Sequence, residues 1–263
     1  MRTIALLGCG WLGFPLAQQL VQASFRVKGS TTSPNKIPQL MQAGIEGFLL
    51  ELNPQLALGD WTGFLADAEV LVVAIPPQLR GANPENFVAK MQLLLENVKL
   101  SGCKKVLFIS STSVYPDQNQ LAIESDTTEF DSQLVLAENL FLSADFCQAT
   151  VIRFGGLIGP ERHPVWFMSG RMQLENPEAP VNLIHQDDCL AILYNCIHLP
   201  FENEVYNAVA PYHPTRVNYY QEKARALQLP LPEFDYSKPS VGKTVSSEKL
   251  QTALGYNFLK PSL

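Results

Sequence analysis

The sequence has few cysteines, no long apolar run and no excess of basic side chains. Its five cysteines among 263 residues are widely spaced and form no Cys-x-x-Cys pair, which argues against a disulfide framework and against a zinc knuckle. No apolar stretch approaches the roughly 18 residues that a membrane span requires, and the run over residues 3–7 stops at glycine before it could form a signal peptide. With 19 basic and 25 acidic residues, the formal charge is −6, which does not favour nucleic acid or an anionic membrane as a partner. We therefore expect a soluble protein of the reducing cytoplasm that binds a small molecule, with no resident metal.

The first 155 residues alternate short apolar runs with helical patterns, which is typical of a parallel sheet covered by helices. The apolar runs over 69–75 and 106–110 are nearly continuous, as expected for strands that are buried on both faces. The pattern predicts a Rossmann-type, doubly wound α/β fold with strands at 3–7, 25–28, 45–52, 69–75, 106–110 and 149–153. Helices are predicted at 11–22, 85–101 and 134–144, and the second of these has Asn83-Pro84 as its start and Gly102 as its end.

After residue 155 the composition shifts toward glycine and proline, which is typical of loops. Helices are expected at 188–198, at 215–228 with Thr215 as N-cap, and at 247–254 with Gly255 as C-cap. We therefore predict a cofactor-binding domain over residues 1–155 and a small substrate-binding region over 156–263, parts of which pack back on the sheet.

A Gly-x-Gly-x-x-Gly loop, formed by Gly8, Gly10 and Gly13, follows the first predicted strand and opens the first predicted helix. In this context the first glycine allows a tight turn, the second lets the backbone approach a pyrophosphate, and the third lets helix and strand pack closely. An ordinary glycine-rich turn is the alternative. We assign to a dinucleotide cofactor Gly8, Gly10, Trp11, Leu12 and Gly13 of the loop, and Leu52, Ile75, Pro76 and Ser110 near later strand ends.

The second strand lacks, at its end, the carboxylate that usually binds the adenosine ribose of NAD. Hydroxyls stand there instead, at Ser30, Thr31 and Thr32, and Lys36 follows closely. These groups could hold a 2′-phosphate without repulsion between like charges, which modestly favours NADP over NAD. A polar turn without a ligand is the alternative.

Residues 110–116, with the sequence SSTSVYP, resemble the SSxSVYG segment of extended short-chain dehydrogenases/reductases, the epimerase/dehydratase-like branch of that superfamily. Residues 152–160 resemble the LRxxNVYGP stretch of the same family, residues 181–188 its NxIHVDD segment, and residues 205–208 its late YNV strand. The overall pattern, which includes GCGWLG and VNLIH, is most similar to the atypical YeeZ-like group. The resemblance implies a Rossmann fold, a nicotinamide cofactor and, at Ser111, a hydroxyl that bonds a substrate oxygen.

The chain departs from this family at the Tyr-x-x-x-Lys relay, in which lysine lowers the pKa of the tyrosine that exchanges a proton. Phe130 stands at the tyrosine position and Leu134 at the lysine position when the sequence is aligned on Ala137-Glu138. Gly156 replaces a family asparagine. A nucleotide-sugar epimerase is therefore disfavoured, and any catalysis needs another acid or base.

The candidate catalytic residues are Ser111, Tyr115 and His163, because they stand in segments whose relatives border the substrate cleft. His163 could instead bond local backbone, and capping is the simpler role for Asp187 and Asp188. Arg162 or Arg171 could bind an anionic substrate. A homodimer is a further possible assembly.

Two functions compete at this point. One is an NAD(P)-dependent oxidoreductase or epimerase-like enzyme for a small polar substrate. The other is a non-catalytic module that senses NADP(H) and signals to a protein partner, which the loss of both relay residues favours. A serine hydrolase is disfavoured because the chain has no Gly-x-Ser-x-Gly, and metal hydrolysis because it has no His-Glu-x-x-His.

Overall fold

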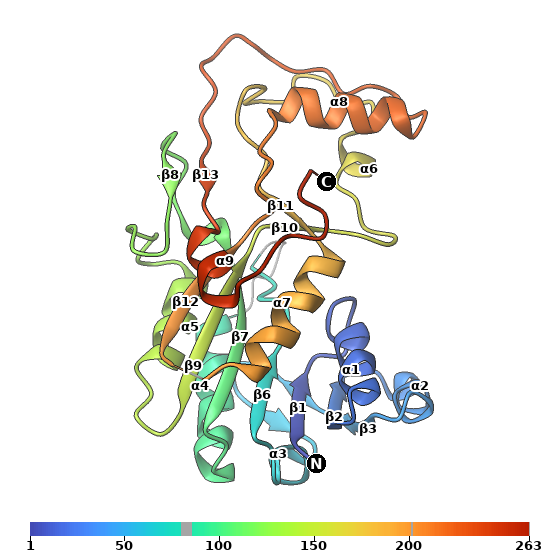
Figure 1. Cartoon of the computed structure of the whole chain (residues 1–263), viewed down its shortest axis with the longest axis vertical. Helices are drawn as coiled ribbons and strands as arrows, with labels where there is room; N and C mark the ends of the chain where they lie inside the picture. The colour runs from blue at the N-terminus through green and yellow to red at the C-terminus, as the bar shows by residue number, and fades with distance from the viewer. Residues whose placement is uncertain (80–85, 201, 263) are drawn as a thin grey trace. The chain divides into compact units, whose positions relative to one another are not determined.

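The computed structural model describes residues 1–79, 86–200 and 202–262 (Figure 1). Its strands are β1 (Thr3–Leu7), β2 (Arg26–Thr31), β3 (Glu46–Leu49), β4 (Glu51–Leu52), β5 (Ala57–Leu58), β6 (Val70–Val73), β7 (Lys105–Ser111), β8 (Leu121–Ala122), β9 (Gln148–Phe154), β10 (Gly156–Ile158), β11 (Leu183–His185), β12 (Glu204–Ala208) and β13 (Thr244–Val245). Its α-helices are α1 (Gly13–Gln22), α2 (Ile37–Gln42), α3 (Trp61–Leu65), α4 (Phe87–Ser101), α5 (Gln133–Leu142), α6 (Val165–Met168), α7 (Gln186–His198), α8 (Arg216–Ala226) and α9 (Glu248–Leu254). Two short 3-10 helices, η1 (Pro34–Lys36) and η2 (Thr112–Val114), complete the elements.

A seven-stranded sheet with the order β12-β9-β7-β6-β1-β2-β3 forms the centre of the fold. The pairs β1–β2, β2–β3, β1–β6 and β6–β7 are parallel. The chain runs outward from β1 to β3, then returns to the other side of β1 and continues outward from β6. The order therefore reverses between β1 and β6, which is the place where open α/β sheets bind their ligands. The predicted Rossmann-type α/β fold is confirmed.

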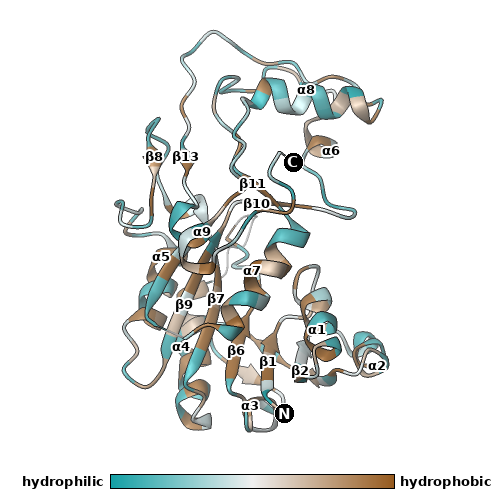
Figure 2. Ribbon diagram, in the orientation of Figure 1, coloured by the Kyte–Doolittle hydropathy of each residue, from teal (hydrophilic) through white to brown (hydrophobic). Residues whose placement is uncertain are grey.

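The central strands are buried because their side chains are apolar on both faces. Every residue of β1 and β6 is buried, and these strands are brown in the hydropathy view (Figure 2). Helix α1 buries Leu16, Ala17 and Leu20 on one side, and α1 packs beside β2. The loop between β1 and α1 is therefore flanked by two packed elements.

Helix α4 has the ends that its sequence allows. Asn86 caps it, since its Oδ1 accepts a hydrogen bond from Ala89 N at 3.0 Å, and Gly102 ends it with a φ of +75°. The helix start predicted at Asn83-Pro84 lies outside the described residues. Thr215 and Gly255 take their predicted places as N-cap of α8 and C-cap of α9.

The chain divides into two compact units that interleave along the sequence. Unit 1 comprises Met1–Ser110, Glu129–Ile152 and Leu190–Val205, and unit 2 comprises Ser111–Thr128, Arg153–Cys189 and Tyr206–Leu263. Residues 111–128 group with the C-terminal part because β8 pairs in parallel with β13. The division between cofactor and substrate regions at residue 155 stays a prediction.

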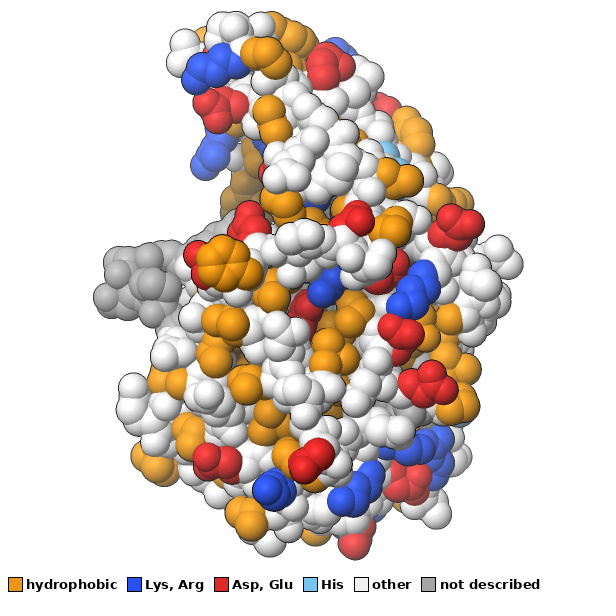
Figure 3. Space-filling model, turned by 90° about the vertical axis from the view of Figure 1, so that its left-hand side faces the viewer, with side chains coloured by type: hydrophobic (Ala, Val, Ile, Leu, Met, Phe, Trp, Pro, Cys, Tyr) orange, Lys and Arg blue, Asp and Glu red, His pale blue; other side chains and the backbone are white. Residues whose placement is uncertain are grey.

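Acidic and basic side chains are intermixed on the face of the molecule in Figure 3. In the described ranges, no helix has the length and apolar character to cross a bilayer. Within the same ranges, no three His, Cys, Asp or Glu side chains gather closely enough to hold a metal ion. All five cysteines are buried free thiols.

Candidate functional site

The glycine loop of unit 1 joins β1 to α1 at the switch point, and its three glycines have different surroundings. Gly8 has a φ of +101°, a conformation that side chains disfavour. A Cβ on Gly13 would lie 2.1 Å from Gly8 O and 2.8 Å from Leu6 Cδ2. A Cβ on Gly10 would meet nothing within 4 Å. Gly8 and Gly13 thus shape the turn, whereas the backbone at Gly10 faces open space that a ligand can enter.

Ser30 of β2 holds this loop in place. Its Oγ accepts a hydrogen bond from Gly8 N at 2.9 Å, and its carbonyl accepts one from Cys9 N at 2.8 Å. A Cβ on Gly29 would lie only 2.6 Å from Cys9 Sγ, so the thiol packs against the glycine of β2. Burial raises the pKa of Cys9 to about 12, which makes this side chain a spacer rather than a nucleophile. The Ser30 hydroxyl therefore supports the loop from within the structure.

The end of β2 and the turn after it contain the groups predicted to bind a phosphate. Thr31 is buried and its Oγ1 accepts a hydrogen bond from Ser33 N at 3.1 Å, so it closes the turn. Thr32 and Lys36 are exposed. Lys36 lies near enough to the loop for its charge to lower the pKa of Cys9, although burial outweighs this effect. Thr32 and Lys36 are thus the accessible members of the predicted set.

Lys28, also on β2, is occupied elsewhere. Only 2% of it is exposed, and its Nζ donates to Gly63 O and Ala66 O, both at 2.7 Å. Because those carbonyls belong to the C-terminal end of α3, the ammonium compensates groups that the helix itself leaves unpaired.

The remaining predicted cofactor residues in unit 1 have distinct places. Ile75 touches the loop, since its Cγ2 would lie 2.9 Å from a Cβ on Gly8. Leu12 is buried as the N-cap residue of α1, Trp11 is partly buried and Pro76 is exposed. Leu52 is buried on β4, where it pairs with Ala57 in a two-stranded ladder. The prediction of one continuous strand over 45–52 is wrong, because the strand is interrupted at Leu50 and forms two strands, β3 and β4.

The relay positions and Ser110 also belong to unit 1. Phe130 is 84% exposed and precedes α5, and Leu134 is buried on that helix. Neither hydrocarbon side chain has a proton to exchange. Ser110 Oγ donates to Glu138 Oε1 at 2.5 Å, and both residues are buried. The hydroxyl of Ser110 therefore bonds helix α5 rather than standing open to a cofactor.

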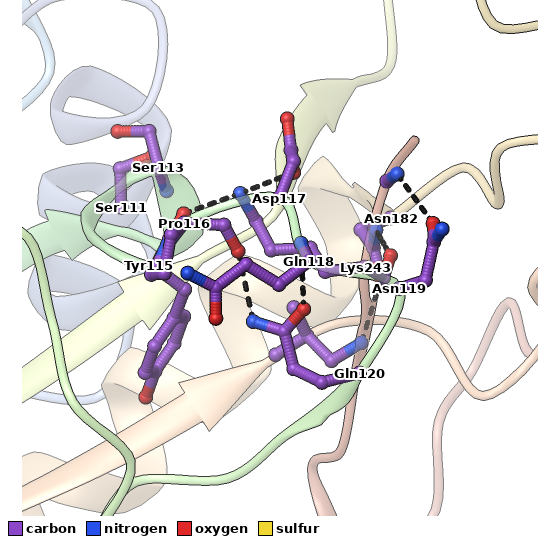
Figure 4. Close-up of polar contacts among 12 residues, drawn as sticks. Ser111, Ser113, Tyr115, Pro116, Asp117, Gln118, Asn119, Gln120, Asn182 and Lys243 are labelled. Atoms are coloured by element: carbon purple, nitrogen blue, oxygen red, sulfur yellow. Dashed lines mark hydrogen bonds and ion pairs between the residues drawn. The ribbon is translucent and has the colours of Figure 1, made fainter. Parts of the chain in front are cut away.

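Ser111 begins the part of the site that lies in unit 2. Its Oγ accepts a hydrogen bond from Ser113 N at 3.1 Å and so caps η2, which follows directly after β7 (Figure 4). This bond uses a lone pair of the hydroxyl and leaves its proton for another acceptor. Ser111 is partly exposed. It is therefore the predicted catalytic residue whose surroundings suit a hydrogen bond to a substrate oxygen.

Tyr115 lies inside unit 2, with 1% of it exposed. Its hydroxyl accepts a hydrogen bond from Arg153 Nη1 at 2.6 Å and donates to Asn207 Oδ1 at 2.9 Å. Burial raises the pKa of this phenol, and the Arg153 charge opposes that effect. The prediction of a catalytic role for Tyr115 does not fit this placement, because the hydroxyl is already engaged within the interior.

His163 is engaged at both ring nitrogens. Its Nδ1 accepts a hydrogen bond from Val165 N at 3.1 Å, and its Nε2 lies 3.1 Å from the Tyr219 hydroxyl. Since Nδ1 accepts, the neutral ring carries its proton on Nε2 and donates it to Tyr219. Burial and the charge of Lys223 lower the pKa of His163. The bond to local backbone, held open as the simpler role, is the one the structure shows.

The other predicted polar residues of unit 2 lie in turns and at the start of α7. Arg162 and Arg171 are exposed, and Arg162 also forms an isolated bridge with Gly159. His185 lies 3.3 Å from the Asp187 carboxylate. Asp188 is fully buried and accepts hydrogen bonds from the Tyr256 hydroxyl at 2.7 Å, from Leu259 N at 2.6 Å and from Lys260 N at 3.1 Å. Because α7 begins at Gln186, Asp188 lies inside its first turn and not at the predicted N-cap, and its carboxylate holds the C-terminal segment.

Unit 2 also contains a pocket of about 200 Å³. Its lining residues are Leu121, Val209, Pro211, His213, Thr244, Val245, Ser246, Ser247, Glu248 and Gln251. None of the predicted catalytic residues is among them.

Lys243 is a polar residue that sequence reasoning missed, and it contacts the segment that follows Ser111. Its Nζ donates to Tyr115 O at 2.6 Å and lies 2.8 Å from Asp117 Oδ1 (Figure 4). Nothing in the sequence around Lys243 indicates this contact, since the partners are 128 and 126 positions away.

The sheet order and the switch-point loop define a Rossmann-type α/β protein, and several solved structures have the same fold. A protein described as MoeE5 in complex with UDP-glucuronic acid and NAD has a TM-score of 0.77 and 18% identity, covering 98% of this chain and 94% of its own. A putative NAD-dependent epimerase/dehydratase from Methylobacillus flagellatus has a TM-score of 0.75 and 22% identity, covering 99% of this chain and 94% of its own. A functionally unknown conserved protein from Silicibacter pomeroyi has a TM-score of 0.79 and 20% identity, covering 100% of this chain and 95% of its own.

The chain belongs to the YeeZ family. It is 31% identical over 267 aligned positions to Protein YeeZ of Escherichia coli strain K12, with 99% of this chain and 97% of that protein covered. A search against models of protein families finds no match.

Proposed function

We propose that the protein is an NAD(P)-dependent oxidoreductase of the epimerase/dehydratase kind that acts on a small polar substrate. The observation that carries the proposal is the glycine loop, in which Gly8 and Gly13 shape a tight turn and Gly10 faces open space. This is the arrangement that a pyrophosphate requires between a strand and a helix N-terminus. MoeE5, which has the same fold, is described in complex with NAD and a UDP-sugar acid.

The loop residues fit the dinucleotide, and the turn after β2 favours NADP. Gly10, Trp11 and Leu12 would lie along the pyrophosphate, with Ile75 beneath the loop. Thr32 and Lys36 would bind the 2′-phosphate, since both are exposed and residues 28–36 include no carboxylate. When bound, the nicotinamide would supply or accept a hydride.

Ser111 binds the substrate oxygen in this proposal, because its hydroxyl is fixed by Ser113 N and retains its proton. We assign no proton transfer to Tyr115 or His163, since both side chains already have partners within unit 2. Arg162 or Arg171, both exposed, would bind an anionic group of the substrate. We place the protein in the reducing cytoplasm, where its five free thiols would persist, and propose that it can form homodimers.

A thermal-shift titration with NAD, NADH, NADP and NADPH tests cofactor binding. A ligand at 100 times its dissociation constant adds about 2.7 kcal/mol of stability, and we expect the phosphorylated pair to give the larger shift. Absence of a shift with all four would overturn the proposal. With a cofactor established, nicotinamide absorbance is followed across a panel of carbonyl compounds and sugars, and Ser111→Ala should lower any turnover while leaving the thermal shift intact.

A non-catalytic sensor of NADP(H) is the second candidate. It is favoured by the replacement of both relay residues and by the engagement of Tyr115 and His163 in internal hydrogen bonds. The same two experiments separate the candidates, because a sensor gives a cofactor-induced thermal shift with no change in nicotinamide absorbance across the panel.

A further inference from the structure

A C-terminal strap, residues 240–246, runs beside the segment that follows Ser111. Asn119 N donates to Gly242 O at 2.7 Å, and Gly242 N donates to Asn119 Oδ1 at 2.9 Å. Thr244 N then donates to Gln120 O at 2.9 Å, where β13 begins to pair with β8. All of these residues belong to unit 2. The strap is thus hydrogen-bonded to Asn119 and Gln120, eight and nine positions after the predicted substrate-binding serine.

Lys243 is the strap residue whose side chain contacts Tyr115 and Asp117, in the segment that follows Ser111. Its Nζ donates to the main-chain oxygen of Tyr115 at 2.6 Å and to Asp117 Oδ1 at 2.8 Å. The Lys243 side chain is 13% exposed and that of Asp117 is 58% exposed. A charged donor that is largely removed from water depends on its partners much more than a surface lysine does.

Asn182 holds the main chain at Lys243 and at Val245, two residues further along the strap. Its Nδ2 donates to Lys243 O at 2.7 Å, and its Oδ1 accepts from Val245 N at 2.9 Å. The lysine side chain therefore leaves a backbone that is itself held, so that its ammonium has a defined position.

The oxygen that Lys243 binds belongs to the residue that closes the turn begun by Ser111. Ser113 N donates to Ser111 Oγ, and Tyr115 N donates to Thr112 O at 3.3 Å, which completes η2. The Tyr115 side chain is anchored separately by Arg153 and Asn207. Tyr115 is consequently held through its ring and through its carbonyl, and the turn between Ser111 and Tyr115 has little freedom to move.

We propose that Lys243 is a positioning residue of the Ser111 site. Its ammonium, bound to the Tyr115 carbonyl and to Asp117, keeps the turn in the form in which Ser111 caps η2 and directs its remaining proton to a ligand. The role of Ser111 rests on the proposed function, whereas the contacts of Lys243 and the order of the turn do not. Lys243 is not a substitute for the missing relay lysine, because it acts through the turn and not on a cofactor.

Hydrogen–deuterium exchange on the full chain tests the effect on the turn. Lys243→Met should speed exchange of the Ser113 and Tyr115 amides by about tenfold or more, because a charge-assisted bond to the turn is lost. Lys243→Arg, which keeps a cation, should restore at least part of the protection. Lys238→Met is the matched control, because Lys238 lies five residues before Lys243 and outside the strap, and its side chain is 78% exposed with Nζ 3.8 Å from Glu175 Oε1. Exchange within twofold of the parent in Lys243→Met, or an equal change in Lys238→Met, would overturn the proposal.

Asp117→Asn is a second variant that tests the same contact if Lys243→Met fails to fold. It removes the charge partner of Lys243 from an exposed position, and the amides of β1 and β6 report whether the rest of the chain stays folded. We expect faster exchange in residues 112–118 with unchanged protection in those strands. Unchanged exchange in residues 112–118 would count against the proposal.

A double-mutant cycle on turnover tests the link to Ser111. If Lys243 acts through Ser111, Lys243→Met should lower kcat about tenfold in the parent chain and cause little further loss in the Ser111→Ala background. Losses that multiply in the double variant would refute that link. Cofactor-induced thermal shifts are measured on the parent chain, so failure of the proposed function is seen there and is distinct from failure of the exchange prediction.

Discussion

Alanine substitutions at Gly10 and Gly13 should distinguish two roles of the glycine loop, which are cofactor binding at Gly10 and close packing of the turn at Gly13. A methyl group on Gly13 would lie 2.1 Å from Gly8 O, and this contact is with backbone that cannot rotate away. A methyl group on Gly10 would meet no atom within 4 Å, and the φ of Gly10 is outside the left-handed region. Gly13→Ala therefore stresses the fold, whereas Gly10→Ala fills only the space assigned to the pyrophosphate.

The two substitutions should change the Tm of the free protein by different amounts. Inserting a methyl group into a packed site costs about 1–3 kcal/mol, and the severity of the Gly13 contact places it near the upper end. A change of 1 kcal/mol moves Tm by roughly 2–4 °C in a domain of 150–250 residues, so Gly13→Ala should lower Tm by roughly 5–10 °C. Gly10→Ala should leave the Tm of the free protein unchanged or slightly higher, because alanine restricts the unfolded chain.

The stabilisation that NADPH causes should be lost in Gly10→Ala, although this substitution hardly changes the Tm of the free protein. A ligand at 100 times its dissociation constant contributes about 2.7 kcal/mol, and a hundredfold loss of affinity reduces this to about 0.4 kcal/mol. The assay is a thermal shift with and without NADPH on the parent, both variants and Gly47→Ala. In the last of these the new methyl makes only ordinary contacts, the nearest at 3.4 Å to the Ile37 side chain. A full NADPH shift in Gly10→Ala would refute the assignment of the pyrophosphate to that space, and an unchanged Tm in Gly13→Ala would refute the packing argument.

Two further predictions concern charge. Lys36→Glu should reduce the thermal shift with NADPH by far more than the shift with NADH, since it places a carboxylate beside the proposed 2′-phosphate; an equal loss with both ligands would contradict the NADP assignment. Burial lowers the pKa of His163 and of His213 below the ordinary value of 6.5. The unfolded chain therefore binds more protons than the folded chain just below that pH, and stability falls as pH drops from about 7 to 5. His163→Asn should weaken this pH dependence in urea unfolding, and an identical slope in parent and variant would contradict it.

Much of the fold follows from local sequence patterns. Continuous apolar runs predict β1, β6, β7 and β9, because strands of a covered parallel sheet are buried on both faces. Glycine and threonine predict helix ends, as at Gly102 and Thr215, because left-handed φ values and capping hydroxyls are local requirements. The interleaving of the two units was not predictable in this way. It depends on pairing between β8 and β13, whose short strands have no periodic signal of their own.

The candidate site shows the same contrast. The glycine loop was recognisable because the left-handed φ of Gly8 and the close contact of Gly13 with Gly8 O are requirements set within a few residues of sequence. The partners of His163, Asp188 and Lys243 were not, because Tyr219, Tyr256 and Tyr115 are brought to them from distant parts of the chain. The sequence therefore predicted a reactive His163, whereas the fold adds the distant Tyr219 hydroxyl to its local partner, Val165 N.

By itself, the sequence determined the parallel α/β class and the position of the glycine loop, since both depend on residue type and short-range spacing. The tertiary structure decided which polar groups are already engaged and which stay accessible. Ser30, Ser110 and Tyr115 have internal hydrogen-bond partners, whereas Ser111, Thr32 and Lys36 stand at least partly exposed. The physical reason is that burial and hydrogen bonding depend on what the fold places around a side chain, and residues far apart in the sequence supply those surroundings.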